Sequence, residues 1–182
     1  STATTQAGRI FSHTARTTRR EIHYDHLISS MPFPRLLQVA QVPYDKEVYS
    51  WNKVLVFNLG FDRKGTERRN NWMYFPDKEL VFYRVGFYDN IIGQDKMSLY
   101  VEIGFNHEQS VDDVQALLER TLADLRKIGI VTDQQLVDYH SVVMDPAYVH
   151  ITQASEQDKA EKMQLLAQHD VYSIGRYGAW KY

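Results

Sequence analysis

The sequence predicts an α+β fold in which an antiparallel β-sheet of about five to seven strands is flanked by helices. Three features lead to this prediction: strand-like segments with apolar or alternating patterns, short connections between them, and amphipathic segments with helical spacing further along the chain. Because a parallel crossover needs about a dozen or more residues, the short connections require antiparallel neighbours. All 182 residues are expected to form a single substrate-binding domain.

The central part of the chain carries the strongest strand patterns. In residues 97–105 every second side chain is apolar, which is the period-two pattern of a half-buried strand. The apolar positions are Leu99, Val101, Ile103 and Phe105, and the positions between them are Tyr100, Glu102 and Gly104. Residues 53–61 and 80–87 are mostly apolar and are predicted as two further strands, with a shorter one at residues 72–75.

The N-terminal part is predicted to contain a hairpin and a short helix. The expected segments are strands at residues 8–11 and 21–24, a basic loop at residues 12–20 between them, and a further apolar piece at residues 26–30. Pro34 suits the first turn of a helix that continues through Ala40, because the missing proline N–H has no helical partner at that position.

The C-terminal part is predicted to be mainly helical. In residues 111–128 apolar side chains recur at intervals of three and four, which indicates an amphipathic helix. Ser110 with Asp113 is interpreted as its capping box, and Gly129 as its C-terminal stop. The other expected elements are a short helix opened by Thr132 with Gln135, a strand at 142–144 ending at Asp145-Pro146, an extended piece at 148–151, a helix capped by Ser155 with Asp158 and running to Gln168, and a strand at 171–174.

The composition limits the classes of function. The net charge of -2 argues against a general nucleic-acid or anionic-membrane surface, and no apolar run is long enough for a membrane helix. The chain has no cysteine, which excludes disulfides, thiolate metal sites and a cysteine nucleophile and fits a cytoplasmic location. The histidines are scattered, and neither a phosphate-binding glycine loop nor a nucleophile elbow occurs. We therefore predict no catalytic residue, no metal site, and no nucleic-acid or membrane partner.

Two arginines stand out because they lie within or beside apolar strand segments. Arg84 interrupts an apolar run between Tyr83 and Val85, where a charge needs either a partner or a cleft. Arg176 lies between Gly175 and Gly178, and glycines allow another group to approach the backbone closely. Two interpretations remain open for each arginine: a side chain that faces water from an edge strand or a turn, or a binding residue in a cleft.

Four motifs follow one another along the chain: Trp72-Met73-Tyr74-Phe75-Pro76, Phe82-Tyr83-Arg84, Asp145-Pro146-Ala147-Tyr148 and Gly175-Arg176-Tyr177-Gly178-Ala179-Trp180-Lys181-Tyr182. In this order they resemble motifs of UDP-galactopyranose mutases, especially the eukaryotic type and its bacterial relatives. The segment from Tyr24 to Pro32 is similar to the part of flavin amine-oxidase-like proteins that returns from the substrate domain toward the flavin. The resemblance covers most of the chain from Tyr24 onward, and the last motif is its most specific part.

This resemblance implies a nucleotide-sugar substrate and a set of binding residues. Arg84 would bind the pyrophosphate, Tyr74 and Tyr148 would donate hydroxyl groups to it, and Tyr182 would close on it from the other side. Arg176, together with Gly175, would lie where the substrate meets the FAD. In the family the reduced flavin acts as a nucleophile at the anomeric carbon of the sugar, so the protein's part is to bind and orient the substrate.

The sequence departs from the family because the glycine-rich loop of the FAD-binding Rossmann domain is absent. We therefore expect a fragment that holds no flavin alone, with the missing domain supplied by a parent protein or by a partner chain, and with self-association into a homo-oligomer as one way to cover the exposed surface. Two alternatives stay open: the substrate domain of a flavin amine or porphyrinogen oxidase with an apolar pocket, and a stand-alone binding module without catalysis.

Overall fold

The structure is a computed structural model that describes residues 2–3, 14–16 and 21–181. Its internal contacts divide the chain into two compact units, the first comprising Ser1–Trp51 with Tyr148–Tyr182 and the second comprising Asn52–Ala147. Strands β5 (Trp51–Phe61) and β9 (Leu136–Val149) each pass from one unit into the other. The two units are thus connected by two strands, and the expectation that the chain forms a single domain stays a prediction.

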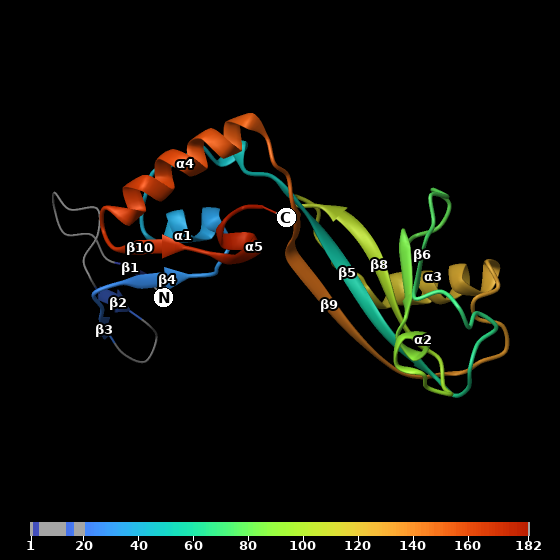
Figure 1. The fold of residues 1–182 in the computed structure, drawn as a ribbon. Coiled ribbons are helices and arrows are strands. Elements are labelled where there is room, and N and C mark those ends of the chain that lie inside the picture. Colours follow the sequence, from blue (N-terminus) through green and yellow to red (C-terminus); the bar gives the residue numbers. More distant parts are fainter. Residues whose placement is uncertain (1, 4–13, 17–20, 182) are drawn as a thin grey trace. The chain divides into compact units, whose positions relative to one another are not determined.

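The second unit is built on a five-stranded antiparallel sheet, which confirms the predicted fold class. The strand order is β6-β7-β8-β5-β9, with β6 at Trp72–Tyr74, β7 at Arg84–Phe87 and β8 at Ser98–Asn106 (Figure 1). The Asp62 amide donates to the Gln135 carbonyl where β5 ends and β9 begins, so this outer pair is antiparallel as well.

The apolar core of this unit lies between the sheet and helix α3 (Val114–Lys127), which runs along one face of the sheet (Figure 1). Val101 and Ile103 of β8 are buried in this core together with Leu118 and Leu125 of the helix. A short helix, α2 (Tyr88–Ile92), follows β7 directly. The opposite face of the sheet carries polar and aromatic side chains, and this face holds the first part of the candidate site.

The first unit has a separate core beneath a two-stranded parallel sheet. Strand β4 (Leu27–Ser29) pairs with β10 (Val171–Ser173), and helices α1 (Phe33–Val39) and α4 (Gln153–Ala167) supply the core residues Phe33, Leu36, Leu37 and Leu166. Two short helices complete this unit: α5 (Gly175–Gly178) and the 3-10 helix η1 (Lys46–Val48). A separate antiparallel sheet is formed by the three short strands β1 (Thr2–Ala3), β2 (Thr14–Arg16) and β3 (Glu21–His23). The parallel pair was not predicted, because the connection-length argument concerns only strands that follow one another closely in the chain.

Both long helices begin at other residues than predicted. The N-cap of α3 is Asp113, whose carboxylate accepts a hydrogen bond from the Ala116 amide at 2.9 Å, so the predicted Ser110–Asp113 capping box is wrong. The capping box of α4 is formed by Thr152 and Ser155, one turn before the predicted Ser155–Asp158 pair. In each case the true cap is the residue whose side chain reaches a free amide of the first turn.

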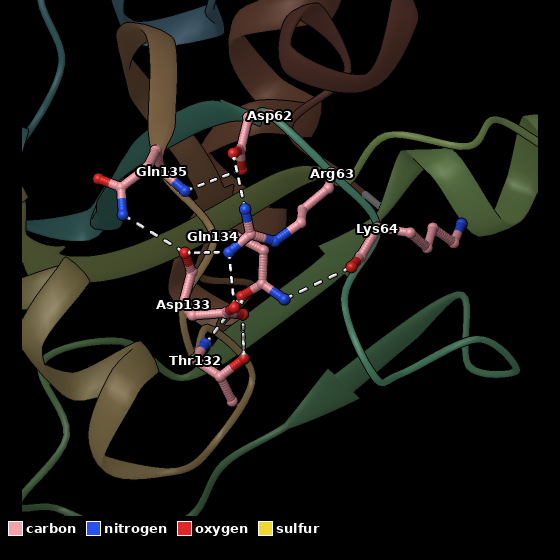
Figure 2. A network of polar contacts seen from close by, with 7 residues as sticks. All are labelled: Asp62, Arg63, Lys64, Thr132, Asp133, Gln134 and Gln135. Carbon is pink, nitrogen blue, oxygen red and sulfur yellow. Dashed lines mark hydrogen bonds and ion pairs between the residues drawn. The ribbon is translucent and has the colours of Figure 1, made fainter.

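The predicted short helix opened by Thr132 with Gln135 is wrong, because strand β9 begins at Leu136 and the residues before it form a loop held by side-chain hydrogen bonds. The Thr132 amide donates to Oε1 of Gln134 at 2.8 Å, and the Gln135 amide donates to Oδ1 of Asp62 at 2.8 Å. Arg63 donates to the Asp133 carbonyl and is ion-paired with the Asp133 carboxylate at 2.6 Å. Figure 2 shows that this network ties the loop before β9 to the end of β5.

Several predicted strand limits are also corrected. The strand predicted at residues 80–87 begins only at Arg84, because the Val81 amide donates to the Asp124 carboxylate of α3 instead of to a neighbouring strand. Strand β9 continues through the cis peptide Asp145-Pro146 rather than ending there. Residues 14–16, predicted as loop, form β2, and the predicted strand at residues 8–11 lies outside the described residues. No helix within the described ranges is long and apolar enough to cross a membrane.

Candidate functional site

A row of three side chains crosses the sheet on the face opposite α3. The strand register pairs Tyr74 of β6 with Arg84 of β7, and Arg84 with Glu102 of β8. Residues paired across strands project from the same face, so these three side chains are neighbours. Strand β7 is an inner strand of the sheet, and only 20% of the Arg84 side chain is exposed. The interpretation of Arg84 as an edge-strand residue that faces water is therefore wrong.

Arg84 is held by charged, polar and aromatic partners at once. Its Nη2 donates to Oε1 of Glu102 in an ion pair, and its Nη1 donates to the Tyr74 hydroxyl at 3.0 Å. The guanidinium carbon lies 5.5 Å from the ring centre of Tyr74, 6.0 Å from that of Tyr83 and 5.8 Å from that of Tyr100. Each such cation–π contact stabilises the guanidinium by roughly 0.5–1 kcal/mol. We call Tyr74, Tyr83, Arg84, Tyr100 and Glu102 the arginine cluster.

Two glycines lie against aromatic rings of this cluster, and of the two only Gly86 must lack a side chain. Gly86 of β7 is paired with Tyr100 of β8, and a Cβ atom on Gly86 would overlap the Tyr100 ring, well inside 3.0 Å. Gly104 lies under Tyr83, whose ring carbons would be 3.7 and 3.8 Å from a Cβ built there. The absence of a side chain at Gly86 thus lets the Tyr100 ring lie flat against the sheet beside Arg84.

The surroundings of Tyr100 also change its acidity. Burial is the main cause that raises the pKa of the Tyr100 hydroxyl, while Arg84 lowers it and Glu102 raises it further. The hydroxyl therefore stays protonated beyond the usual range and keeps its hydrogen for donation.

The second candidate arginine lies in the other unit. The guanidinium carbon of Arg176 in α5 is 5.3 Å from the ring centre of Tyr148 and 5.8 Å from that of Tyr177. Tyr148 belongs to the end of β9, so this contact joins α5 to that strand. The ligand-binding role of Arg176 stays a prediction.

The two glycines of α5 have different surroundings. Gly175 opens the helix with a φ of +78°, in the left-handed region that favours glycine, and a Cβ there would lie 3.8 Å from Cβ of Ser30. A Cβ on Gly178 would lie 2.9 Å from Ser173 Oγ and 3.2 Å from the Ser29 carbonyl oxygen. Gly178 therefore serves the packing of α5 on β4 and β10, whereas Gly175 is needed for its backbone conformation.

A flavin dinucleotide fits these residues only in part. Such a cofactor binds its pyrophosphate at a glycine-rich turn that opens a helix of a parallel βαβ unit, and the sequence has no such turn. The contact of Gly175 and Arg176 with the FAD stays a prediction. Among the described residues, no group of three or more His, Asp or Glu side chains could hold a metal ion.

The structure brings the predicted site residues together as two pairs. Tyr74 contacts Arg84 in the second unit, and Tyr148 contacts Arg176 in the first. Convergence of the two pairs on one cleft stays a prediction, and Tyr182 lies outside the described residues.

Sequence reasoning missed three members of the arginine cluster. It assigned Tyr100 and Glu102 to the polar side of their strand without a partner, and it gave Tyr83 no role. The available signal was the glutamate inside the apolar run Val101-Glu102-Ile103, which, like Arg84, requires a partner when buried. The partner follows only from the register between β7 and β8.

The fold is shared with parts of several solved structures. A reduced UDP-galactopyranose mutase superposes with a TM-score of 0.79 at 20% sequence identity, over 93% of this chain and 39% of the mutase chain. A putative protoporphyrinogen oxidase from Exiguobacterium sp. 255-15 superposes with a TM-score of 0.74 at 15% identity, over 97% of this chain and 41% of the oxidase chain. A CLA-producing fatty acid isomerase from P. acnes has a TM-score of 0.57 at 12% identity, over 92% of this chain and 41% of the isomerase chain.

These likenesses define a class of fold and no more than that. The chain spans about two fifths of the length of each of these structures. No protein-family model matches the sequence, and no curated protein matches it. The chain thus shares its fold with one part of each of these proteins, and its substrate must be argued from its own residues.

Proposed function

We propose that this chain is the nucleotide-sugar-binding part of a FAD-dependent enzyme of the UDP-galactopyranose mutase type. The observation that carries the proposal is the contact between Arg84 and Tyr74. These are two of the residues that the sequence resemblance assigns to the pyrophosphate, and the Arg84 guanidinium donates to the Tyr74 hydroxyl within a cage of aromatic rings.

The chemistry of this pair suits a pyrophosphate group. A guanidinium presents a planar fork of N–H donors that matches phosphate oxygens, and its charge strengthens each hydrogen bond. The tyrosine hydroxyl adds a donor on a rigid ring without adding charge. The aromatic cage restricts the Arg84 side chain before the ligand arrives, which lowers the entropy lost on binding. Arg176 with Tyr148 would form the second half of the clamp.

A second candidate is the substrate domain of a porphyrinogen-oxidising flavoenzyme. It is favoured by the likeness to the putative protoporphyrinogen oxidase, which extends over 97% of this chain. Such a substrate would require an apolar surface and no pyrophosphate clamp. A buried ion pair at the centre of the candidate site argues for the polar ligand, since charged groups in an apolar pocket are costly unless the ligand uses them.

A further polypeptide segment is proposed as the partner of the first unit, either from a parent protein or from a separate chain that carries the FAD-binding domain. Strands β4 and β10 form a parallel sheet of only two strands, and Ile28 and Tyr172, paired across it, are 66% and 40% exposed. Ile174, directly after β10, is 51% exposed. Parallel sheets are normally covered on both faces, so this apolar face suits burial by additional chain.

Titration of the chain with UDP by calorimetry or ligand-observed NMR tests the proposed function. We expect weak but measurable binding, because the chain offers only part of a pocket, and we expect Arg84→Ala to abolish it. Arg19→Ala, in the basic N-terminal stretch, should leave the binding unchanged. Equal UDP binding by the Arg84→Ala protein and the unaltered protein would show that the clamp is wrong. Binding of a porphyrin but not of UDP would favour the second candidate.

A further inference from the structure

Glu102 is a buried carboxylate at the centre of the candidate site. Its residue is 4% exposed, and it lies in the middle of β8 on the face opposite α3. Both carboxylate oxygens have a donor: Oε1 accepts from Nη2 of Arg84 and Oε2 accepts from the Tyr83 hydroxyl. The two donors bind different oxygens of the carboxylate, and the backbone of Glu102 is held by the hydrogen bonds of the strand. Glu102 is therefore a stationary negative charge in direct contact with the guanidinium.

This negative charge changes what Arg84 offers to a ligand. The ion pair has a net charge of zero, so an anion that approaches Arg84 meets the attraction of the guanidinium and the repulsion of the carboxylate together. Both interactions act where only 20% of the arginine side chain and 6% of the glutamate side chain are exposed, so water screens them weakly. A bare anion should consequently gain little from this site. A larger ligand can gain more from hydrogen bonds and ring contacts of the cluster.

We propose that Glu102 is a specificity-determining residue, a fixed counter-charge that weakens the binding of simple anions at Arg84. The site then favours ligands that also use the hydroxyl groups and rings around the guanidinium. This inference rests on the proposed function, since it assumes that Arg84 meets an anionic group of the ligand. It adds that Glu102 limits the affinity for that group.

The test uses inorganic pyrophosphate as the probe and the full chain as the protein. Dissociation constants are measured by calorimetry at low and at high ionic strength for the unaltered chain, Glu102→Gln, Arg84→Gln, and the double variant. We expect Glu102→Gln to bind pyrophosphate about tenfold more tightly at low ionic strength, because one repelling charge is removed at short range. The gain should shrink at high ionic strength, and it should be absent when Arg84 is already glutamine.

A matched variant shows whether the loss of any negative charge has this effect. Glu119→Gln removes one negative charge from an exposed position of α3, outside the arginine cluster, so its affinity for pyrophosphate should stay within about twofold of that of the unaltered chain. Thermal unfolding shows which variants are folded. If Glu102→Gln does not fold, Glu102→Met removes the same charge with a side chain of similar length and takes its place.

The outcomes distinguish this inference from the proposed function. If Arg84→Gln loses pyrophosphate binding while Glu102→Gln equals the unaltered chain or binds more weakly, the counter-charge role is wrong and the clamp stands. If Arg84→Gln binds pyrophosphate as well as the unaltered chain does, the clamp itself fails. A gain from Glu102→Gln that persists in the double variant, or no detectable binding by either the unaltered chain or Glu102→Gln, also overturns the inference.

Discussion

Arg84 and Glu102 face each other across strands β7 and β8, and the guanidinium of one is ion-paired with the carboxylate of the other. The register of the sheet creates this relationship, since each residue stands alone within its own apolar strand segment. The pair and the rings around it form a rigid polar site on one face of the sheet.

Gly86→Ala should destabilise the sheet, because the new Cβ would overlap the Tyr100 ring. We expect a loss of about 1–3 kcal/mol in the free energy of unfolding, the usual cost of forcing extra volume into a packed site. Urea denaturation would measure it. Gly60→Ala is the matched control in β5, where a Cβ would only come within 3.7 Å of the Asp138 carbonyl. Equal stability of both variants would contradict the close packing of Tyr100.

Asp124→Ala should also lower the free energy of unfolding, by about 1–3 kcal/mol. The Asp124 carboxylate is buried in α3, accepts from the Val81 amide at 2.9 Å and from Nε of Arg120 at 3.0 Å, and so anchors the loop before β7. Its loss leaves the Val81 amide without this acceptor. Glu119→Gln, at an exposed position of the same helix, should change the stability by less than about 0.5 kcal/mol. A similar effect of both substitutions would exclude the anchoring role.

Tyr49 should make the stability of the first unit depend on alkaline pH. Burial is the main cause that raises the pKa of Tyr49 above its ordinary value of 10.0, and the hydrogen bond to Asp158, 2.8 Å long, adds to it. Because the pKa of Tyr49 is higher in the folded protein than in the unfolded chain, the protonated hydroxyl contributes its full stabilisation below pH 10.0. This contribution to the free energy of unfolding is lost as the pH rises further. Chemical denaturation of Tyr49→Phe above pH 10 should therefore show a weaker pH dependence than that of the unaltered chain. Tyr139→Phe, at an exposed position, should retain the original slope.

The purified chain should be colourless. The physical reason is the missing glycine-rich turn, at which a flavin dinucleotide binds its pyrophosphate. The visible absorbance spectrum after purification measures this directly, with free FAD added and removed by gel filtration as the control. A stoichiometric flavin spectrum that survives the filtration would show that the chain contains a complete flavin site.

The exposed face of the β4–β10 pair should promote self-association of the isolated chain. Ile28→Lys places a charge at the centre of this face and should shift the sedimentation profile at high protein concentration toward the monomer. Ile92→Lys, at a similarly exposed isoleucine of α2, is the control and should have no such effect. If Ile28→Lys and the unaltered chain sediment alike as oligomers, the association uses another surface.

Local patterns were sufficient to predict much of this fold. The alternation in residues 97–105 and the apolar run at residues 53–61 correspond to β8 and β5, and the three-and-four spacing after residue 111 corresponds to α3. These patterns work because a strand or helix must turn its own apolar side chains to one face, whichever neighbour covers that face. The caps were less predictable, since Asp113 and Thr152 each compete with nearby polar residues for the same amides.

The tertiary structure alone decided the contacts between distant segments. The Gln135 amide donates to the Asp62 carboxylate just after β5, and the chain continues from there into strand β9 instead of a helix. Likewise, Val171 lies beside Leu27, although most of the chain separates them. By itself the sequence determined which residue types occur at the site, including Arg84 and Tyr74. The register between strands decided that Glu102 is the counter-ion of Arg84, because pairing depends on the whole sheet and cannot be read from one strand.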